Sequence, residues 1–398
     1  MPRAAIVSPL RTPIGGFLKS LAPLPAEELA AHIISSVVAK SGIDPDQIDD
    51  VVFAQSYANS EAPCIGRWAA LHAGLPISVP GCQVDRRCGG GLQAIINASM
   101  MVQTGAADVV LAGGVESMSN VEFYSTAMRR GSKAGSTLLF DRLERGRERS
   151  QPVERFGVIS GMIETAENLA RDFSISREEA DQYSVESHRR AAAAWDAGKF
   201  NAEVVHVSIP GRKNDLQVFS KDEGIRSDCS IEALAGLRPI MAGGTVTPGN
   251  ASQQNDAAAA CLIVAEDKLS TLNLEPLAFL SSWAVTGCEP ATMGLGPVPA
   301  VSKLFQRAKL SWDDLDLIEL NEAFAAQVLA VMKGWGFSDM SRINVNGSGI
   351  SLGHPIAATG VRIMTSMLYE LEKRNGRRAL ETMCIGGGQG IAAVFERD

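Results

Sequence analysis

A cysteine followed by three glycines is the residue best suited to covalent chemistry in this sequence. Cys88 stands in D-R-R-C-G-G-G-L-Q-A, and residues 92–104 after it have a helical pattern. The positive end of that helix, with Arg86 and Arg87, is expected to lower the pKa of the thiol. Glycine lets a substrate approach closely, which favours a thiolate nucleophile. A buried, inert cysteine in a glycine turn fits the segment equally well.

Two further reactive groups lie in glycine-rich turns near the end of the chain. His354, in N-G-S-G-I-S-L-G-H-P, can accept a proton from Cys88 or donate to a developing oxyanion. Cys384, in M-C-I-G-G-G-Q-G, follows a strand pattern, and its thiolate could act as a base. The structural alternatives are a histidine satisfied by its neighbours and a core cysteine at the end of a strand.

Polar residues at two other turns are weaker candidates. Asn321 and Glu322 follow the apolar strand L-D-L-I-E-L, where α/β proteins build their sites, and Asn321 could hold a water or a carbonyl. The same pair also fits a simple helix cap. Ser252 ends the polar turn T-V-T-P-G-N-A-S and could contact an amide of a ligand, although an ordinary loop has the same composition.

A basic stretch interrupts this acidic protein between residues 129 and 155. It holds eight lysines and arginines but four acidic residues. It fits either a solvated loop or a collar for an anionic ligand such as a phosphorylated cofactor. The basic residues are Arg129, Arg130, Lys133, Arg142, Arg145, Arg147, Arg149 and Arg155.

The surrounding pattern predicts an α/β fold of two similar halves. Strands are expected at 4–9, 50–55 and 108–114 in the first half and at 277–285, 315–320, 342–347, 382–388 and 391–396 in the second. Helices are expected at 25–40, 92–104 and 355–373, and such alternation favours a buried parallel sheet. Residues 119–249 have a different texture and are interpreted as an insertion, with a helix capped by Ser176 and Glu179.

Composition excludes several classes of protein. The net charge of -8 argues against nucleic acid as the main partner. No apolar run reaches the ~18 residues that a membrane span needs, and no secretory signal is recognisable. Seven cysteines without a C-x-x-C pair suggest free thiols in a reducing compartment, so we expect a cytoplasmic protein. The five scattered histidines make a metal site unexpected.

Six motifs, in order, resemble those of the thiolase family. They are D-R-R-C-G-G-G-L-Q-A, G-G-V-E-S-M-S, T-V-T-P-G-N-A-S, N-E-A-F-A, G-H-P-I-A-A-T-G and C-I-G-G-G-Q-G. The resemblance implies the thiolase fold, in which two βαβαβαββ halves form five α-β-α-β-α layers and an inserted loop domain covers the active site. The implied division is 1–118 with about 250–270, then 119–249, then 271–398.

The resemblance also implies roles for individual residues. Cys88 is expected to carry the acyl group, His354 to activate it, and Cys384 to act as acid and base at the α-carbon. A water held by Asn321 and His354 would form one oxyanion hole, and the N–H groups of Cys88 and Gly386 the other. The implied contacts with coenzyme A and the acyl chain are Arg226, Ser252, Met162, Met293, Ala323 and Phe324.

The implied activity is an acyl-CoA C-acyltransferase that condenses acetyl-CoA with an acyl-CoA or cleaves a 3-oxoacyl-CoA, with acetoacetyl-CoA favoured. A degradative thiolase of broader acyl specificity is the main alternative. A ketoacyl-synthase-type enzyme usually has two histidines, whereas only His354 lies beyond residue 206 here, and a non-catalytic acyl-CoA-binding protein is a remote option. Coenzyme A and acyl-CoA are expected as substrates, no cofactor as permanently bound, and the chain as a homotetramer or dimer.

The sequence departs from the family pattern around the expected ligand. The usual H-M-G before T-A-E-N reads G-M-I at 161–163, so a histidine is replaced by Gly161. Met241 stands where a phenylalanine is common, Pro248 interrupts T-A-G-N-A-S, and Gly89 and Gly90 follow the nucleophile. These differences concern contacts with coenzyme A and the acyl chain, so the resemblance does not fix chain length.

Overall fold

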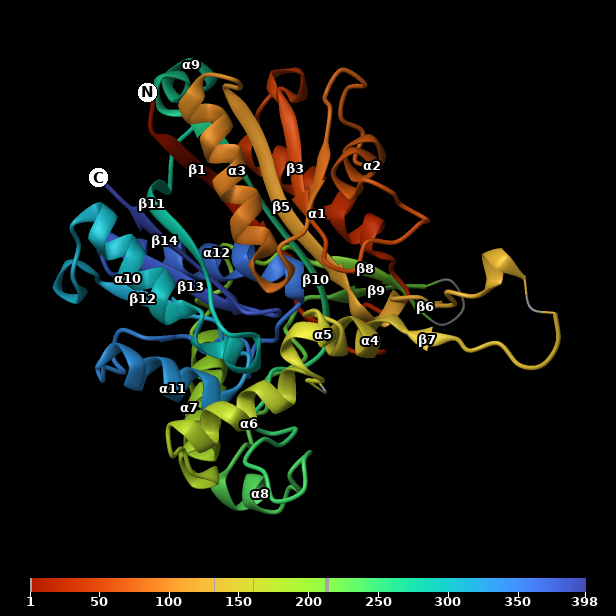
Figure 1. The fold of residues 1–398 in the computed structure, drawn as a ribbon. Helices are drawn as coiled ribbons and strands as arrows, with labels where there is room; N and C mark the ends of the chain where they lie inside the picture. The colour runs from red at the N-terminus through yellow and green to blue at the C-terminus, as the bar shows by residue number, and fades with distance from the viewer. Residues whose placement is uncertain (1, 132, 160, 212–214) are drawn as a thin grey trace.

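The first half of the chain forms a βαβαβαββ unit whose last strand follows a long insertion. The computed structural model describes residues 2–131, 133–159, 161–211 and 215–398 (Figure 1). The unit also holds the two-residue strand β2 (Gly15–Gly16), which pairs with β10. Its main elements are β1 (Ala4–Arg11), α1 (Ala26–Ser41), β3 (Asp50–Ala54), α2 (Ile65–His72), β4 (Cys82–Val84), α3 (Gly90–Thr104), β5 (Val109–Ser117) and β10 (Asn255–Ala265).

The second half repeats this order with one strand reduced to isolated bridges. The strand expected at 342–347 is wrong: only single bridges form there, including Ile343 beside Ile318. Asn344 has φ of 45°, and its side chain accepts from the N–H and donates to the carbonyl of Leu320, in place of a strand ladder. The elements are β11 (Ala278–Gly287), α10 (Pro297–Ala308), β12 (Leu317–Leu320), α11 (Ala325–Trp335), α12 (Thr359–Lys373), β13 (Arg378–Ile385) and β14 (Gln389–Glu396).

The strands of both halves form one continuous sheet path. Its order is β12-β13-β14-β11-β1-β10-β5-β3-β4, so the first strands of the two halves, β1 and β11, are neighbours. They pair antiparallel over Ala4–Ile6 and 278–280. Each half is mixed, because β3 runs parallel to β5 and β12 parallel to β13, whereas the remaining long pairs are antiparallel.

Three apolar clusters show that the helices and sheets form five layers. Strand residues alternate between clusters: in β10, Cys261 faces the central layer and Leu262 the outer one. The central cluster joins α3 and α12 to the inner faces of both sheet halves. The outer clusters pack α1 and α2 on the first half and α10 and α11 on the second. The α-β-α-β-α arrangement therefore follows from the period of two along each strand.

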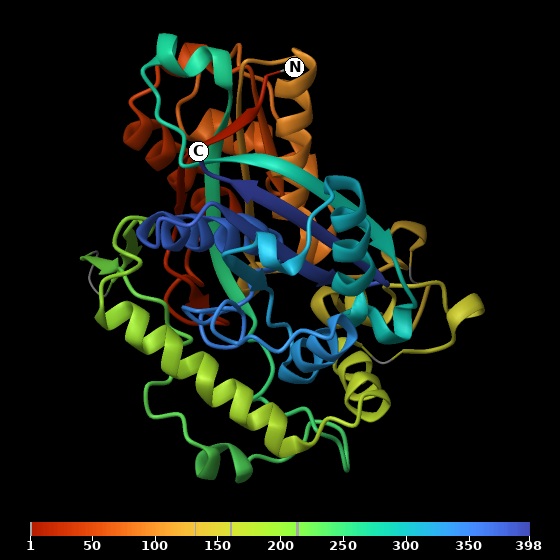
Figure 2. The same cartoon turned by 90° about the vertical axis from the view of Figure 1, so that its left-hand side faces the viewer.

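The insertion between β5 and β10 lies below the sheets and extends sideways (Figure 1). A hairpin arm of β6 (Phe123–Tyr124) and β7 (Phe140–Asp141) projects from the body. The long helix α7 runs along the lower edge (Figure 2) and begins with the expected capping box of Ser176 and Glu179. The other elements are α4 (Arg142–Glu148), α5 (Val153–Phe156), α6 (Met162–Asp172), α7 (Arg177–Asp196), β8 (Val207–Pro210), β9 (Leu216–Phe219) and α8 (Ile231–Ala235). We propose the domain division that the sequence indicates: residues 1–118 with about 250–270, then 119–249, and then 271–398.

Both termini lie on the same side of the molecule (Figures 1 and 2). The guanidinium of Arg3 donates to Asp398 at 2.7 Å, which ties the two ends of the chain together. Among the described residues, no helix is long and apolar enough to cross a membrane.

Candidate active site

Cys88 lies at the amino end of the central helix α3, in the short 3-10 turn Arg87–Gly89. The glycines after it allow α3 to approach the loop that carries His354. A Cβ on Gly91 would lie 2.6 Å from the carbonyl oxygen of Ala357, which is closer than a side chain can approach. The sequence therefore uses glycine here to bring the two halves together at the nucleophile.

Burial has a larger effect on the Cys88 thiol than its positive surroundings. Desolvation raises the pKa of Cys88 above its ordinary value, although Arg87 and the backbone N–H of Gly386 each favour the thiolate. The expected net lowering of this pKa is therefore wrong in sign, because removal from water exceeds the helix and arginine effects. In the resting state Cys88 is a thiol that needs a base.

His354 is fixed beside this cysteine by contacts at three points. Its backbone N–H donates to Asn255 Oδ1 at 2.9 Å, and its Nδ1 lies 2.6 Å from Thr359 Oγ1 in the first turn of α12. Its Nε2 lies 3.5 Å from Asn321 Nδ2. Burial, with the charges of Arg362 and Arg147, lowers the pKa of His354 to about 3. The imidazole is thus neutral in the resting site.

Asn321 follows β12 and lies directly behind His354. Its side chain is fully buried, and within the described part of the chain its Oδ1 has no hydrogen-bond partner. Buried amide oxygens rarely lack a partner, so this atom is suited to a water or a ligand group. Asn321 does not itself line the cavity described below.

Cys384 lies near the end of β13, and Gly386 lies in the turn that joins β13 to β14. Burial, and then the proximity of Cys88 and Cys288, raises the pKa of Cys384 well above its ordinary value. The N–H of Gly386 points at Cys88. The end of β13 and the turn after it therefore place a second, weakly acidic thiol and a hydrogen-bond donor beside the first cysteine.

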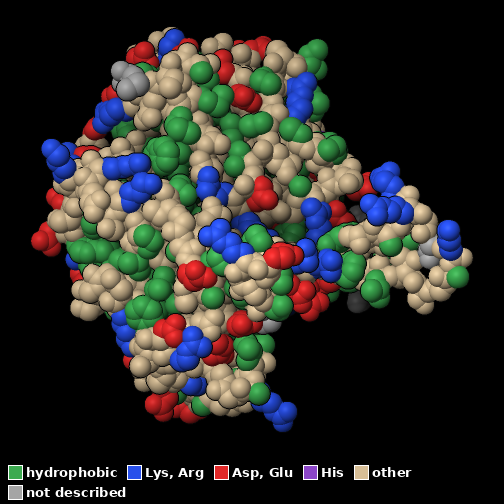
Figure 3. Space-filling model, viewed as in Figure 1, with side chains coloured by type: hydrophobic (Ala, Val, Ile, Leu, Met, Phe, Trp, Pro, Cys, Tyr) green, Lys and Arg blue, Asp and Glu red, His purple; other side chains and the backbone are tan. Residues whose placement is uncertain are grey.

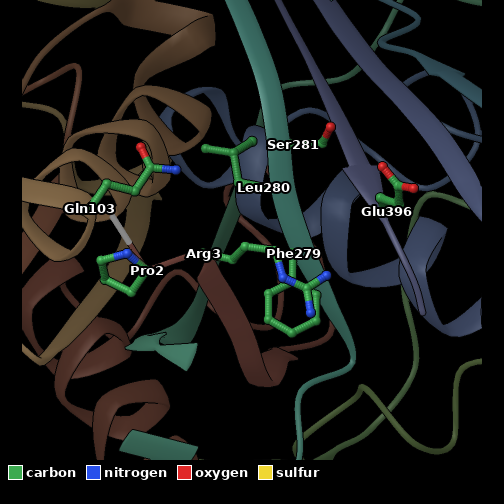
Figure 4. A pocket seen from close by; sticks show the side chains of 7 residues that line it. All are labelled: Pro2, Arg3, Gln103, Phe279, Leu280, Ser281 and Glu396. Atoms are coloured by element: carbon green, nitrogen blue, oxygen red, sulfur yellow. The ribbon is translucent and has the colours of Figure 1, made fainter. Parts of the chain in front are cut away.

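One cavity of about 580 Å³ brings most of the expected residues together. Cys88, His354 and Cys384 line it from three separate segments. The six expected ligand contacts line it too: Arg226, Ser252, Met162, Met293, Ala323 and Phe324. A smaller cavity near the chain ends, of about 370 Å³, has none of these residues and holds the Arg3 guanidinium 3.8 Å from the centre of the Phe279 ring (Figure 4).

Three residues at the site were not singled out from the sequence. Thr359 and Glu116 stand inside recognised motifs, and Arg147 stands inside the basic stretch. The buried Glu116 carboxylate accepts from the N–H groups of Ser56, Tyr57 and Ala357 at 3.1–3.2 Å, and burial raises its pKa to about 7. It joins loops of both halves beneath Cys88, whereas Arg147 lines the cavity.

Comparisons with known proteins show the family to which the chain belongs. Residues 4–267 match the family model of the thiolase N-terminal domain, and residues 274–397 match that of the thiolase C-terminal domain. An acetyl-CoA acetyltransferase of Chromobacterium violaceum is 43% identical over 397 residues, covering 99% of both chains. The beta-ketothiolase BktB of Cupriavidus necator is 44% identical over 395 residues, covering 98% of both.

Solved structures show the same fold along the whole chain. The acetyl-CoA acetyltransferase of Bacillus anthracis superposes with a TM-score of 0.95 at 38% identity, covering 100% of this chain and 99% of that one. Human mitochondrial 3-ketoacyl-CoA thiolase in complex with CoA gives a TM-score of 0.93 at 38% identity, with 100% and 98% covered.

Proposed function

Because the chain belongs to the thiolase family and is an acyl-CoA C-acyltransferase, we propose that it works through an acyl group carried on Cys88. The observation that supports this assignment is the single cavity lined by Cys88, His354 and Cys384. Coenzyme A and its thioesters are the substrates. No step of the proposed cycle requires a permanently bound cofactor.

In the first half of the cycle, the neutral imidazole of His354 accepts the proton of the Cys88 thiol. The thiolate attacks the thioester carbonyl, whose developing oxyanion receives hydrogen bonds from the N–H groups of Cys88 and Gly386. The Cys384 thiol then protonates the departing sulfur of coenzyme A. This leaves the acyl group on Cys88, an imidazolium at His354 and a thiolate at Cys384.

In the second half, the Cys384 thiolate removes an α-proton from acetyl-CoA. A thiolate whose pKa burial has raised is a strong base, which suits a weakly acidic carbon. A water held by Asn321 and His354 stabilises the enolate oxygen. The enolate attacks the acyl group, Cys88 departs and recovers its proton from His354, and every group returns to its starting state.

The six remaining residues are proposed to hold the substrate. Arg226 and Ser252 would contact coenzyme A, with the Ala323–Phe324 backbone alongside. The Ser252 N–H donates to the Ala323 carbonyl at 2.9 Å, which ties these two segments together. Met162 and Met293 would line the acyl group, since both lie in the cluster that also holds Cys384.

The deciding experiment is kcat/KM for thiolysis of 3-oxoacyl-CoAs of increasing length. We propose that acetoacetyl-CoA is the preferred unsubstituted substrate, so kcat/KM should decline as the alkyl chain grows. A maximum at long chains would favour the broader degradative activity, and an absence of turnover with every member would contradict the enzyme assignment.

We further propose a cytoplasmic homo-oligomer, a tetramer or a dimer, that acts in fatty acid metabolism. All seven cysteines are free thiols, as in proteins of reducing compartments. The projecting arm exposes apolar side chains that a second copy could cover, namely Phe123, Met128, Leu138 and Leu139.

A further inference from the structure

One cation of the basic stretch lies inside the catalytic cavity. Arg147, on α4, lines the same cavity as Cys88 and His354 and is half-buried. The other lining residues near it are mainly apolar, such as Met118 and Ile356. Lysine and arginine side chains also gather on the outside, where the arm leaves the body (Figure 3). Arg147 differs from these because it faces the reacting groups.

The charges of Arg147 and Arg226 act on different histidines. Burial, then the charges of Arg362 and Arg147, lower the pKa of His354, whereas burial raises the pKa of Tyr57 and the charge of Arg147 opposes that rise. Burial, and then the charge of Arg226, lower the pKa of His188. Both arginines line the cavity, and Arg147 is the one whose charge acts on His354, beside the reacting groups.

The guanidinium of Arg147 has no acidic partner among the described residues. A flip of the Gln254 amide brings its oxygen to face Arg147, and in that orientation it accepts from both terminal nitrogens at 3.2 and 3.3 Å. Its neighbours differ, since Arg142 pairs with Glu122 at 2.7 Å and Arg145 stacks on the ring of Phe140. Glu144 also lines the cavity but is exposed, so water screens its carboxylate. A half-buried arginine held by one neutral amide retains donors for an anion.

Space for that anion exists beside Arg147. Gly161 lines the cavity and carries no side chain. A Cβ on Gly161 would meet only the Cβ of Arg147, at 3.8 Å, and its φ of +148° favours glycine. The absence of a side chain at Gly161 thus leaves room next to Arg147.

From these observations we infer that Arg147 selects acyl-CoA substrates whose acyl chain carries a carboxylate. A guanidinium binds a carboxylate through two parallel charge-assisted hydrogen bonds, whereas an alkyl end would leave the cation desolvated and unpaired. The inference rests on the proposed function and names its substrate class: 3-oxoacyl-CoAs with a terminal carboxylate.

The test compares kcat/KM for thiolysis within matched pairs. The pairs are 3-oxohexanoyl-CoA with 3-oxohexanedioyl-CoA, and 3-oxooctanoyl-CoA with 3-oxooctanedioyl-CoA. The wild type should favour the carboxylated member of at least one pair. Arg147→Met should reduce that preference by about 10- to 100-fold, the range expected for charge-assisted hydrogen bonds. A ratio within each pair cancels any common effect of the lost charge on His354.

Two control variants distinguish the effect of the charge at Arg147 on substrate preference from the effect of a charge nearby. Arg147→Lys should retain part of the preference, since it keeps the positive charge but loses the paired N–H donors of the guanidinium. Arg145→Met removes a charge from the same helix, on the side facing Phe140, and should leave the ratio unaltered. The same ratios measured with pantetheine thioesters, which lack the nucleotide phosphates, should also depend on Arg147. A loss of that dependence would mean that Arg147 binds coenzyme A instead.

The inference and the proposed function fail in different ways. A wild type that cleaves acetoacetyl-CoA but shows no preference for either carboxylated substrate overturns the role of Arg147 alone. A preference that survives Arg147→Met also overturns it. A wild type that cleaves no 3-oxoacyl-CoA at all overturns the proposed function.

Discussion

Replacing Glu381 with leucine should make the protein more stable. Glu381 lies on β13, fully buried in the central layer, directly beside Glu319 of β12. Within the described residues neither of its carboxyl oxygens has a hydrogen-bond partner. The nearby cation Arg362, on α12, donates instead to the carbonyl oxygen of Gly353, just before His354, at 3.2 Å.

The size of the expected rise in stability follows from the protonation state of the Glu381 carboxyl. Burial, and then repulsion from Glu319, raises the pKa of Glu381 well above its ordinary value, which favours the protonated, neutral carboxyl. An unpaired buried polar group lowers the free energy of unfolding by about 1–3 kcal/mol. Leucine removes this destabilisation and adds only a small cost for its larger volume. Unfolding entropy of about 2.1 cal/mol/K per residue then converts this into a rise in Tm of about 1–4 °C.

Differential scanning calorimetry at pH 7 measures this rise, with Glu381→Gln as the matched control. Glutamine keeps the shape and leaves polar atoms unpaired, so its Tm should stay near that of the wild type. A fall in Tm with leucine, equivalent to about 3–5 kcal/mol, would mean that Glu381 is ionised and is the counter-charge of Arg362, and would refute the reasoning.

Two further predictions concern the histidine. Thr359→Val removes the 2.6 Å contact with His354 Nδ1 and should lower kcat about 5- to 30-fold, whereas Thr359→Ser should retain activity; an unaffected kcat in steady-state thiolysis would exclude a positioning role. The pKa of His354 falls from 6.5 to about 3 on folding, so the folded state favours the neutral imidazole. Its contribution to the free energy of unfolding is complete above pH 6.5 and is lost as the pH falls toward 3, by about 5 kcal/mol in total. Tm measured between pH 6.5 and 4 should therefore decline less steeply in His354→Asn than in the wild type, and equal slopes would contradict the burial argument.

Periodicity in the sequence was sufficient to predict most of the fold. Apolar runs such as the one at 50–55 and the caps at Ser176 and Glu179 depend on local chemistry, which the sequence displays directly. The expected strand at 342–347 failed because Asn344 uses its side chain to satisfy the edge of β12. This use of a side chain in place of strand pairing depends on a tertiary contact, which the β-branched pattern of the segment does not reveal.

The site was predictable in its reactive groups but not in its electrostatics. Cys88, His354 and Cys384 stand in glycine turns that are visible in the sequence. The raised pKa of Cys88 was not predictable, because desolvation depends on how completely both halves enclose the thiol. Arg147 could not be separated from its basic neighbours, since only the orientation of α4 directs it into the cavity.

The separate roles of Cys88 as acyl carrier and Cys384 as base are tested most directly by mass spectrometry of Cys384→Ser incubated with acetyl-CoA. The account predicts that Cys88 still gains one acetyl group, while acetoacetyl-CoA formation falls by about 10²- to 10⁴-fold, as expected for the loss of a general base. Condensation at a rate near that of the wild type in this variant would show that another group removes the α-proton, and the proposed mechanism would be wrong.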